Sequence, residues 1–141
     1  MLYRNKKPHD PNAGKWVGIG GKFESGETPE ECLLREVYEE TGLKLTSYVF
    51  HGIIEFRNDA CPDEDMYLYS ADGFCGAEGE LPNITCNEGE AHWVPAGEVL
   101  GLSLWEGDRF FLEPLIHGDK AINMRLIYSG DTLVSVENMS K

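Results

Sequence analysis

Apolar and polar residues alternate with two different periods along this chain, and these periods divide it into strands and helices. Short segments rich in branched and aromatic residues, bounded by turn residues, are expected to form strands. These segments are residues 1–7, 16–19, 45–56, 66–74, 91–94, 122–128 and 132–136, the last two joined by a hairpin turn at 129–131. The expected loops are residues 8–15, 58–65 and 78–90, and 95–100 are expected to form one helical turn. With helices at 29–41 and 108–117, the pattern predicts a mixed α/β domain whose strands are largely antiparallel.

The first helix carries sequence signals at both of its ends. Thr28 is a good N-cap, Pro29 occupies the first helical position, and Glu31 completes a Thr-x-x-Glu capping box. Gly42 is a natural left-handed stop. The helix is therefore expected to run from Pro29 to Thr41.

Three glutamates share one side of this helix. At about 100° per residue, Glu36, Glu39 and Glu40 fall within one arc because they are three and four residues apart. The neighbouring arc is apolar and is expected to pack on the core; its members are Leu33, Leu34, Val37 and Tyr38. The clustered carboxylates repel one another and lie where the helix dipole disfavours anions. Either this is a solvated charged face, or hard divalent cations bind it, since Mg²⁺ prefers oxygen ligands.

The loop before the helix favours the second interpretation. Gly20 and Gly21 allow the backbone to approach a ligand and leave a main-chain carbonyl to face a metal. Lys22 places a positive charge in the same loop, where it could bind a phosphate oxygen. Glu27 and Arg35 are expected to pair across the junction of loop and helix, which would fix the start of the helix and orient its carboxylates.

The composition of the chain limits the classes of molecule that it is expected to bind. The net charge of −13 argues against DNA or RNA, but it permits a small polyphosphate that divalent cations bridge to the protein. At 141 residues the chain fits one domain, with no apolar run near the roughly 18 residues of a membrane-spanning helix. The four cysteines contain no Cys-x-x-Cys pair, which argues against zinc and dithiol redox chemistry. Because no secretory signal is present, we expect a cytoplasmic protein with no membrane partner.

The segment from Gly21 to Leu43 resembles the Nudix box. That box reads G-x5-E-x7-R-E-U-x-E-E-x-G-U, where U is aliphatic, and the chain matches it at every defined position. The matching residues are Gly21, Glu27, Arg35, Glu36, Val37, Glu39, Glu40, Gly42 and Leu43. The resemblance implies a Nudix-type α/β/α sandwich with a mixed, largely antiparallel sheet and a loop-helix-loop catalytic motif. Residues 1–141 would form a single domain of this kind.

The same resemblance implies a metal site. In the family, the glutamates of the box bind Mg²⁺ or Mn²⁺. The expected ligands are therefore Glu36, Glu39, Glu40 and the carbonyl of Gly20. The family often adds a distant glutamate, for which Glu88 is favoured and Glu90 is the competing candidate. The alternative for Glu88 is a plain acidic residue of a surface loop.

The reaction implied is hydrolysis of a diphosphate linkage. The metals bridge phosphate oxygens, neutralise developing charge and lower the pKa of a bound water. Either Glu39 or Glu88 then takes the proton as water attacks phosphorus. Arg35 and Lys22 are expected to support the catalytic groups, and Gly21 and Lys22 to contact the substrate. A nucleoside triphosphate would yield a monophosphate and pyrophosphate.

Over nearly its whole length the chain resembles MutT-like 8-oxo-dGTP diphosphatases, the oxidised purine nucleoside triphosphate hydrolases that sanitise the nucleotide pool. Residues 15–22 and 104–108 carry this part of the resemblance. In such enzymes a Trp and nearby aspartates contact the base, and Trp105 and Asp108 match them. An indole offers a stacking face, and a carboxyl group can pair with the purine edge. The alternative is that Trp105 anchors the core and Asp108 caps the following helix.

Three departures from the family pattern bear on substrate and assembly. Val17 stands where base-reading relatives often carry Asn, and Gly107 replaces an aspartate, which should relax base selectivity. Relatives usually carry another strand before Leu2, so we expect an open sheet edge. Either an upstream start has been omitted, or a partner chain compensates, as in a homodimer. The alternative functions are hydrolysis of another nucleoside diphosphate derivative, such as ADP-ribose or a dinucleoside polyphosphate, and a non-catalytic Nudix-fold ligand sensor.

Overall fold

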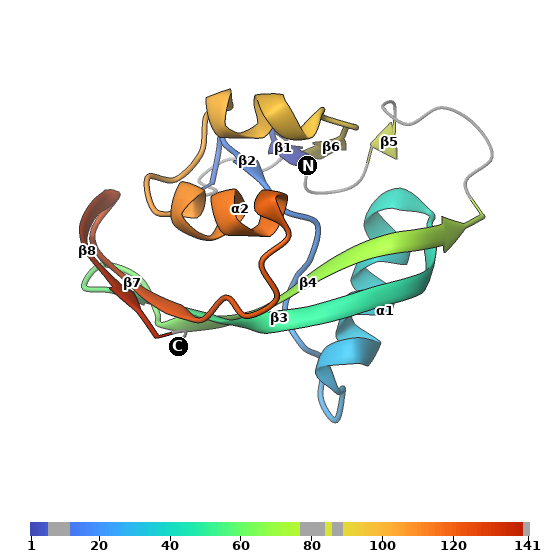
Figure 1. Ribbon diagram of the computed structural model, residues 1–141, viewed down its shortest axis with the longest axis horizontal. Coiled ribbons are helices and arrows are strands. Elements are labelled where there is room, and N and C mark those ends of the chain that lie inside the picture. The colour runs from blue at the N-terminus through green and yellow to red at the C-terminus, as the bar shows by residue number, and fades with distance from the viewer. Residues whose placement is uncertain (6–11, 77–83, 86–88, 140–141) are drawn as a thin grey trace. The chain divides into compact units, whose positions relative to one another are not determined.

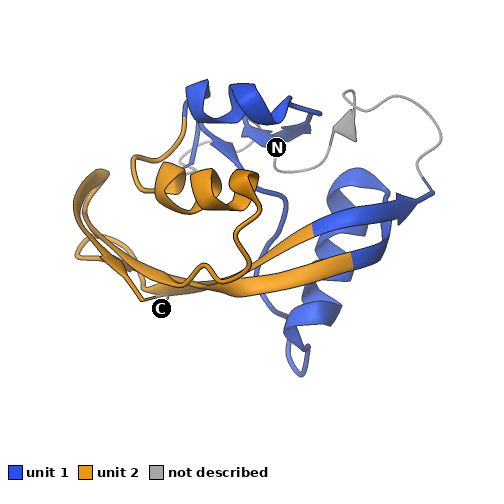
Figure 2. Cartoon of the chain, viewed as in Figure 1, with its two compact units in different colours: residues 1–47, 71–103 blue, residues 48–70, 104–141 orange. Residues whose placement is uncertain are grey.

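The computed structural model describes residues 1–5, 12–76, 84–85 and 89–139 of the chain (Figure 1). It divides into two compact units, coloured separately in Figure 2. Unit 1 comprises Met1–Ser47 and Ala71–Ser103, and unit 2 comprises Tyr48–Ser70 and Leu104–Lys141. Two long strands, β3 (Lys44–Asn58) and β4 (Glu64–Cys75), contribute residues to both units.

Unit 1 contains a small antiparallel sheet in the order β2-β1-β6-β5. Its strands are β1 (Leu2–Arg4), β2 (Trp16–Val17), β5 (Ile84–Thr85) and β6 (Gly89–Ala91). The expectation of an irregular segment at 78–90 is therefore wrong where β5 and β6 form, and the strand expected at 91–94 lies earlier. At Gly89 a side chain would collide with the carbonyl oxygen of Tyr3, so glycine permits the close pairing of β6 with β1.

The helix of unit 1, α1 (Pro29–Thr41), has the predicted bounds. The hydroxyl of Thr28 accepts a hydrogen bond from the Glu31 amide, the Glu31 carboxylate accepts one from the Thr28 amide, and Gly42 ends the helix at φ 76°. The prediction of its apolar side is wrong in part, because Leu34 and Tyr38 are exposed. The residues that face the core of the unit are Cys32, Val37, Glu40 and Thr41. The expected helical turn is a 3₁₀ helix, η1 (Ala96–Gly101).

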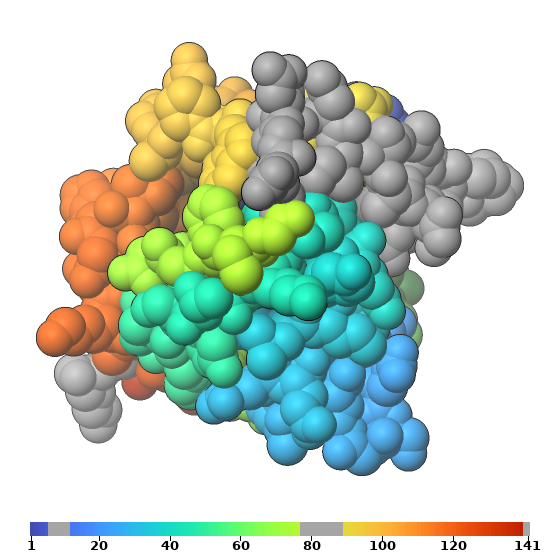
Figure 3. All heavy atoms as spheres, turned by 90° about the vertical axis from the view of Figure 1, so that its right-hand side faces the viewer, coloured from blue at the N-terminus to red at the C-terminus, as the bar shows by residue number. Residues whose placement is uncertain are grey.

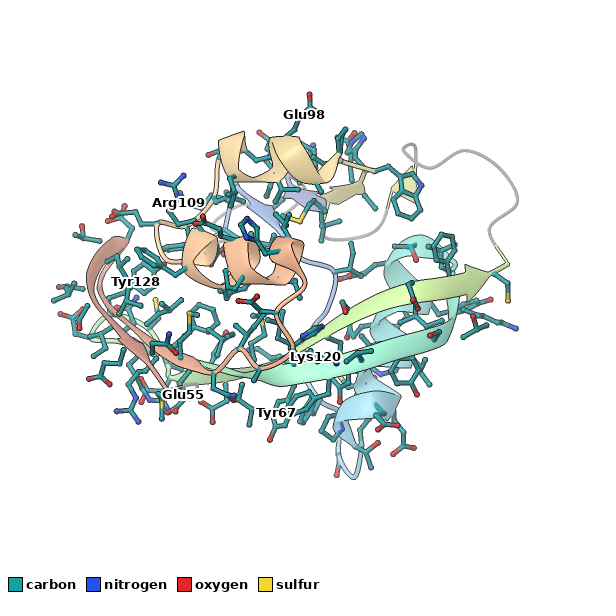
Figure 4. All side chains as sticks on the ribbon, in the orientation of Figure 1. Glu55, Tyr67, Glu98, Arg109, Lys120 and Tyr128 are labelled. Carbon is teal, nitrogen blue, oxygen red and sulfur yellow. The ribbon has the colours of Figure 1, made fainter. Side chains whose placement is uncertain are left out.

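Unit 2 contains most of the second sheet, in the order β4-β3-β7-β8. The hairpin of β7 (Met124–Ser129) and β8 (Thr132–Asn138) confirms the prediction, while β7 runs parallel to β3. Helix α2 (Asp108–His117) covers one face of this sheet (Figure 1). A cluster of buried side chains fills the space between them: Ile54, Leu68, Phe111, Ile122, Met124, Leu126 and Tyr128. Glu55 and Tyr67 project from the opposite face (Figure 4).

The strand at the start of the chain is an interior strand of its sheet. Leu2 pairs with Val17 of β2 on one side and with Ala91 of β6 on the other. The edge strands of the two sheets are β2 and β5, and β4 and β8. The expectation of a further strand before Leu2, or of a partner chain in its place, stays a prediction. Within the described residues, no helix combines the length and the apolar character needed to cross a membrane.

Candidate functional site

An arginine on α1 joins the helix to the loop before it, as the sequence predicts. The Nε of Arg35 donates to Glu27 Oε2 over 2.7 Å, and its Nη2 donates to Glu27 Oε1 over 2.9 Å. This two-bond geometry is the strongest form of ion pair between these side chains. Hydrogen bonds from the Arg35 side chain and the Glu24 amide lower the pKa of Glu27 to about 2. Glu27 therefore remains a carboxylate and holds the guanidinium in place.

The same guanidinium holds two of the three predicted ligands. Arg35 Nη1 lies 2.7 Å from Glu36 Oε1 and 3.2 Å from Glu39 Oε2. The Glu36 side chain is 14% exposed and that of Glu39 is 55% exposed. The two carboxylates thus share one cation but differ in their access to water.

Glu40, the third predicted ligand, is a buried charged residue. Only 4% of its surface is exposed, and its Oε2 accepts a hydrogen bond from the Gly20 amide over 3.0 Å. Glu40 therefore does not belong to a solvated face, whereas Glu39 on the same side of α1 is exposed. Burial of a carboxylate is costly unless hydrogen bonds or cations compensate for the lost hydration. A cation bound near Glu40 would therefore stabilise this side chain.

Gly21 lies directly against the carboxylate of Glu36, so any other residue here would displace that carboxylate. A side chain at residue 21 would place its Cβ 2.6 Å from both carboxylate oxygens of Glu36. The main-chain oxygen of Gly21 accepts a weak hydrogen bond from the buried Cys32 thiol at 3.6 Å. Burial raises the pKa of Cys32 to about 11, so the thiol stays protonated. The glycine turn thus packs directly on the acidic helix.

The oxygen donors of this region fit a hard divalent cation. Carboxylates and a backbone carbonyl are the ligands that Mg²⁺ prefers, and the absence of a side chain at Gly21 lets the Glu36 carboxylate lie against the glycine turn. In the described part of the chain, no three His, Cys, Asp or Glu side chains converge as a metal-binding group. Arg35 instead holds Glu36 and Glu39, and the Gly20 amide holds Glu40. Lys22 is exposed on the same loop, and its carbonyl accepts from Arg35 Nη2 over 3.0 Å.

Of the two candidates for a distant glutamate, Glu90 lies within the described residues and Glu88 does not. Glu88 lies outside the described residues, so its role stays a prediction. Glu90, on β6, accepts a hydrogen bond from Asn5 Nδ2 over 2.6 Å, and its other oxygen lies 3.6 Å from His92 Nε2. Glu90 therefore contributes to contacts within the small sheet.

The residues predicted to contact a base belong to unit 2, whereas the acidic helix belongs to unit 1. Trp105 is half-buried and packs edge-on against Tyr128, with ring centroids 5.5 Å apart, on the core of its unit. Asp108 is the first residue of α2 and is only 8% exposed. The N-cap of that helix is Gly107, so the alternative that Asp108 caps it is wrong.

A contact that the sequence did not predict explains Gly107. Its amide donates to the hydroxyl of Tyr128 over 2.7 Å, and a Cβ at this position would lie 2.6 Å from that hydroxyl. Burial raises the pKa of Tyr128 to about 12, and the side chain lies on the side of the sheet that α2 covers (Figure 4). Met124, Leu126 and Tyr128 alternate along one strand, and this pattern could have indicated that Tyr128 is buried and that its hydroxyl needs a hydrogen-bond partner. An aspartate cannot replace Gly107 without displacing Tyr128.

Comparisons with known proteins extend over most of the chain. The NUDIX domain family matches residues 1–114. The oxidized purine nucleoside triphosphate hydrolase of Mus musculus is 30% identical over 124 residues, covering 87% of this chain and 76% of the mouse protein. The uncharacterized Nudix hydrolase YvcI of Bacillus subtilis (strain 168) is 27% identical, covering 84% of this chain and 75% of its own. The crystal structure of the mMutator MutT protein from Bacillus halodurans has a TM-score of 0.80 at 29% identity, covering 95% of this chain and 86% of that one.

Proposed function

Because this chain belongs to the Nudix family of hydrolases, we propose that it is a divalent-metal-dependent pyrophosphohydrolase of a nucleoside triphosphate. The products would be a nucleoside monophosphate and pyrophosphate. The expected Nudix fold class is confirmed by the family match and by the MutT structure.

The observation that carries the proposal is the arrangement of charge on α1. One carboxylate is buried, a second is largely shielded, and a third is exposed; these are Glu40, Glu36 and Glu39 respectively. A single guanidinium, itself anchored by Glu27, bridges two of them. Such a concentration of anions lowers stability on its own, but it suits a site where divalent cations meet a polyphosphate.

Each residue near this cluster has a role in the proposed mechanism. Glu36, Glu39, Glu40 and the carbonyl of Gly20 would hold the cation. When bound, a cation of this kind polarises phosphate oxygens and lowers the pKa of a bound water. Arg35 needs only its Nη1 to neutralise Glu36 and Glu39, since Nε and Nη2 remain on Glu27. The ion pair of Arg35 and Glu27 would thus keep the helix oriented when Glu36 and Glu39 bind a cation in place of Arg35.

Two further roles concern the water and the phosphates. Glu39 is the exposed member of the set, so a water molecule can reach it, and it suits the general base for attack on phosphorus. Glu88 is the alternative base. The exposed Lys22 suits a phosphate oxygen of the substrate. The products leave as the bond between the α and β phosphoryl groups breaks.

We propose 8-oxo-dGTP, or a related oxidised purine nucleotide, as the substrate. The support is the mouse relative, whose name describes hydrolysis of oxidized purine nucleoside triphosphates, together with Trp105 and Asp108. One observation favours a second candidate, another nucleoside diphosphate derivative such as ADP-ribose. Trp105 packs on the core of unit 2, and Gly107 leaves no room for a second aspartate. Product analysis with a panel of nucleotides that includes both separates these two candidates, and equal kcat/KM values for 8-oxo-dGTP and dGTP in kinetic competition would reject the oxidised purine.

The hydrolase proposal is tested by pyrophosphate release with Mg²⁺ or Mn²⁺ and a panel of nucleoside triphosphates. Glu39→Gln should reduce kcat by about 10²-fold or more. The amide that replaces the exposed carboxylate carries no charge to hold the cation and cannot accept the proton. Glu30→Gln is the matched control, since Glu30 is an exposed glutamate in the first turn of the same helix. Equal activity of wild type and Glu39→Gln would reject the role of Glu39. No release from any nucleotide would favour a ligand sensor.

A further inference from the structure

Two large aromatic side chains of unit 1 lie side by side at the surface. Phe74, near the end of β4, is 46% exposed, and Trp93, just after β6, is 56% exposed. Their ring centroids are 5.5 Å apart and the rings are tilted by 34°. A single exposed aromatic residue is common, but a paired surface of this kind often marks a binding site. About half of the surface of each residue is therefore accessible to a ligand.

The chain leads from Phe74 to the end of the acidic helix. Two residues after Phe74, a Cβ at Gly76 would lie 3.6 Å from the carbonyl oxygen of Gly42, which ends α1. Figure 3 shows this end of β4 in lime beside the teal atoms around the end of α1. Glu39 and Glu40 stand in the last turn of that helix. The end of β4 therefore lies at the same end of α1 as two of the proposed metal ligands.

Trp93 follows a residue that packs on the strand leading into the glycine turn. Its neighbour His92 packs edge-on against the Trp16 ring of β2, with centroids 5.5 Å apart. The chain runs from β2 into the glycine turn, where the Gly20 amide binds the Glu40 carboxylate. Within unit 1, Phe74 thus lies two residues from a contact with the end of α1, and Trp93 adjoins a residue that packs on the strand before the glycine turn.

The pair differs from Trp105, the tryptophan that the sequence predicts to contact the base. Trp105 is half-buried, meets Tyr128 edge-on at 85° and packs on the core cluster of unit 2. Much of its surface is already used in holding that unit together. Phe74 and Trp93 are exposed, and stacking on a base requires an accessible aromatic side chain.

We propose that Phe74 and Trp93 form a stacking surface for the base of the nucleotide whose phosphates meet the acidic helix. This inference rests on the proposed function and adds a base-binding subsite to it. Stacking on an aromatic face tolerates different bases because every base has such a face. The subsite therefore sets affinity for nucleosides over bare polyphosphate, and leaves the choice between oxidised and normal purines to other residues.

The test compares a ligand that has a base with one that lacks it. For Trp93→Ala and Phe74→Ala, we measure KM and kcat for nucleoside triphosphate hydrolysis and the Ki of inorganic triphosphate as a competing probe. Each variant should raise KM by about 5-fold to 150-fold, the range for loss of one base–aromatic stack. The kcat and the Ki should change little, because the phosphates still meet an intact acidic helix. Trp93→Phe should retain most of the affinity.

The matched control is Phe50→Ala, since Phe50 is 48% exposed and lies in unit 2. It should leave KM unchanged. A second readout isolates the fluorescence of Trp93 as the difference between the spectra of wild type and Trp93→Phe. Nucleotide should quench its fluorescence, and inorganic triphosphate should not.

Several outcomes would overturn the inference while the hydrolase stands. These are a wild-type KM in both alanine variants, a Ki for inorganic triphosphate that rises together with KM, and no quenching of Trp93 by nucleotide. Absence of hydrolysis by the wild-type protein would instead reject the proposed function, and the inference with it.

Discussion

Gly107→Ala tests the contact that most distinguishes this chain from the family pattern. At φ −78° the backbone of Gly107 suits any residue, so alanine adds no backbone strain. Its Cβ, however, would lie 2.6 Å from the Tyr128 hydroxyl and 2.9 Å from Leu126 Cδ1, in a buried position. Displacing Tyr128 also breaks the 2.7 Å hydrogen bond from the Gly107 amide.

The cost of this substitution follows from two terms. Overpacking a core by one methyl group costs about 1–3 kcal/mol, and loss of a buried hydrogen bond costs about 1 kcal/mol. We expect Gly107→Ala to lower the free energy of unfolding by about 2–4 kcal/mol. With a urea m-value of about 2 kcal/mol/M, the midpoint should fall by about 1–2 M.

The assay is urea unfolding followed by circular dichroism, with two comparisons. Gly101→Ala is the matched control, because a Cβ there meets no atom within 4 Å, and it should change stability by less than about 0.5 kcal/mol. Tyr128→Phe removes the hydroxyl, so Gly107→Ala should cost at least about 1 kcal/mol less in that background. Equal costs in both backgrounds, or no difference between Gly107→Ala and Gly101→Ala, would refute the reasoning.

Two further predictions concern the start of the acidic helix. Thr28→Ala removes the hydroxyl that accepts a hydrogen bond from the Glu31 amide, so the free energy of unfolding should fall by about 1 kcal/mol. Ser25→Ala, at an exposed position in the preceding loop, is the control and should leave the free energy of unfolding unchanged. Equal urea midpoints for the two variants would exclude a stabilising cap. Hydrogen bonding to Arg35 lowers the pKa of Glu27 from 4.5 to about 2, so its contribution to stability is complete above pH 4.5 and is lost as the pH falls towards 2. The stability difference between wild type and Glu27→Gln should therefore shrink across that interval, and a constant difference would contradict the ion pair.

Local interactions explain what could be predicted before the fold was known. The bounds of α1, its capping box and its left-handed Gly42 depend on residues within a few positions of one another, and the structure confirms all three. The pair of Glu27 and Arg35 spans one junction between loop and helix and is also confirmed. Spacing alone placed Glu36, Glu39 and Glu40 on one side of the helix, because helical geometry follows from the period of the chain.

The remaining features depend on contacts between residues distant along the chain. A helical period gives the angle between two side chains, but it does not say which angle faces the core. Only packing therefore decided that Glu40 is buried while Leu34 and Tyr38 are exposed. The pairing of β6 with β1 at Gly89, and the bond between Gly107 and Tyr128, likewise arise from surfaces that meet only when the chain folds.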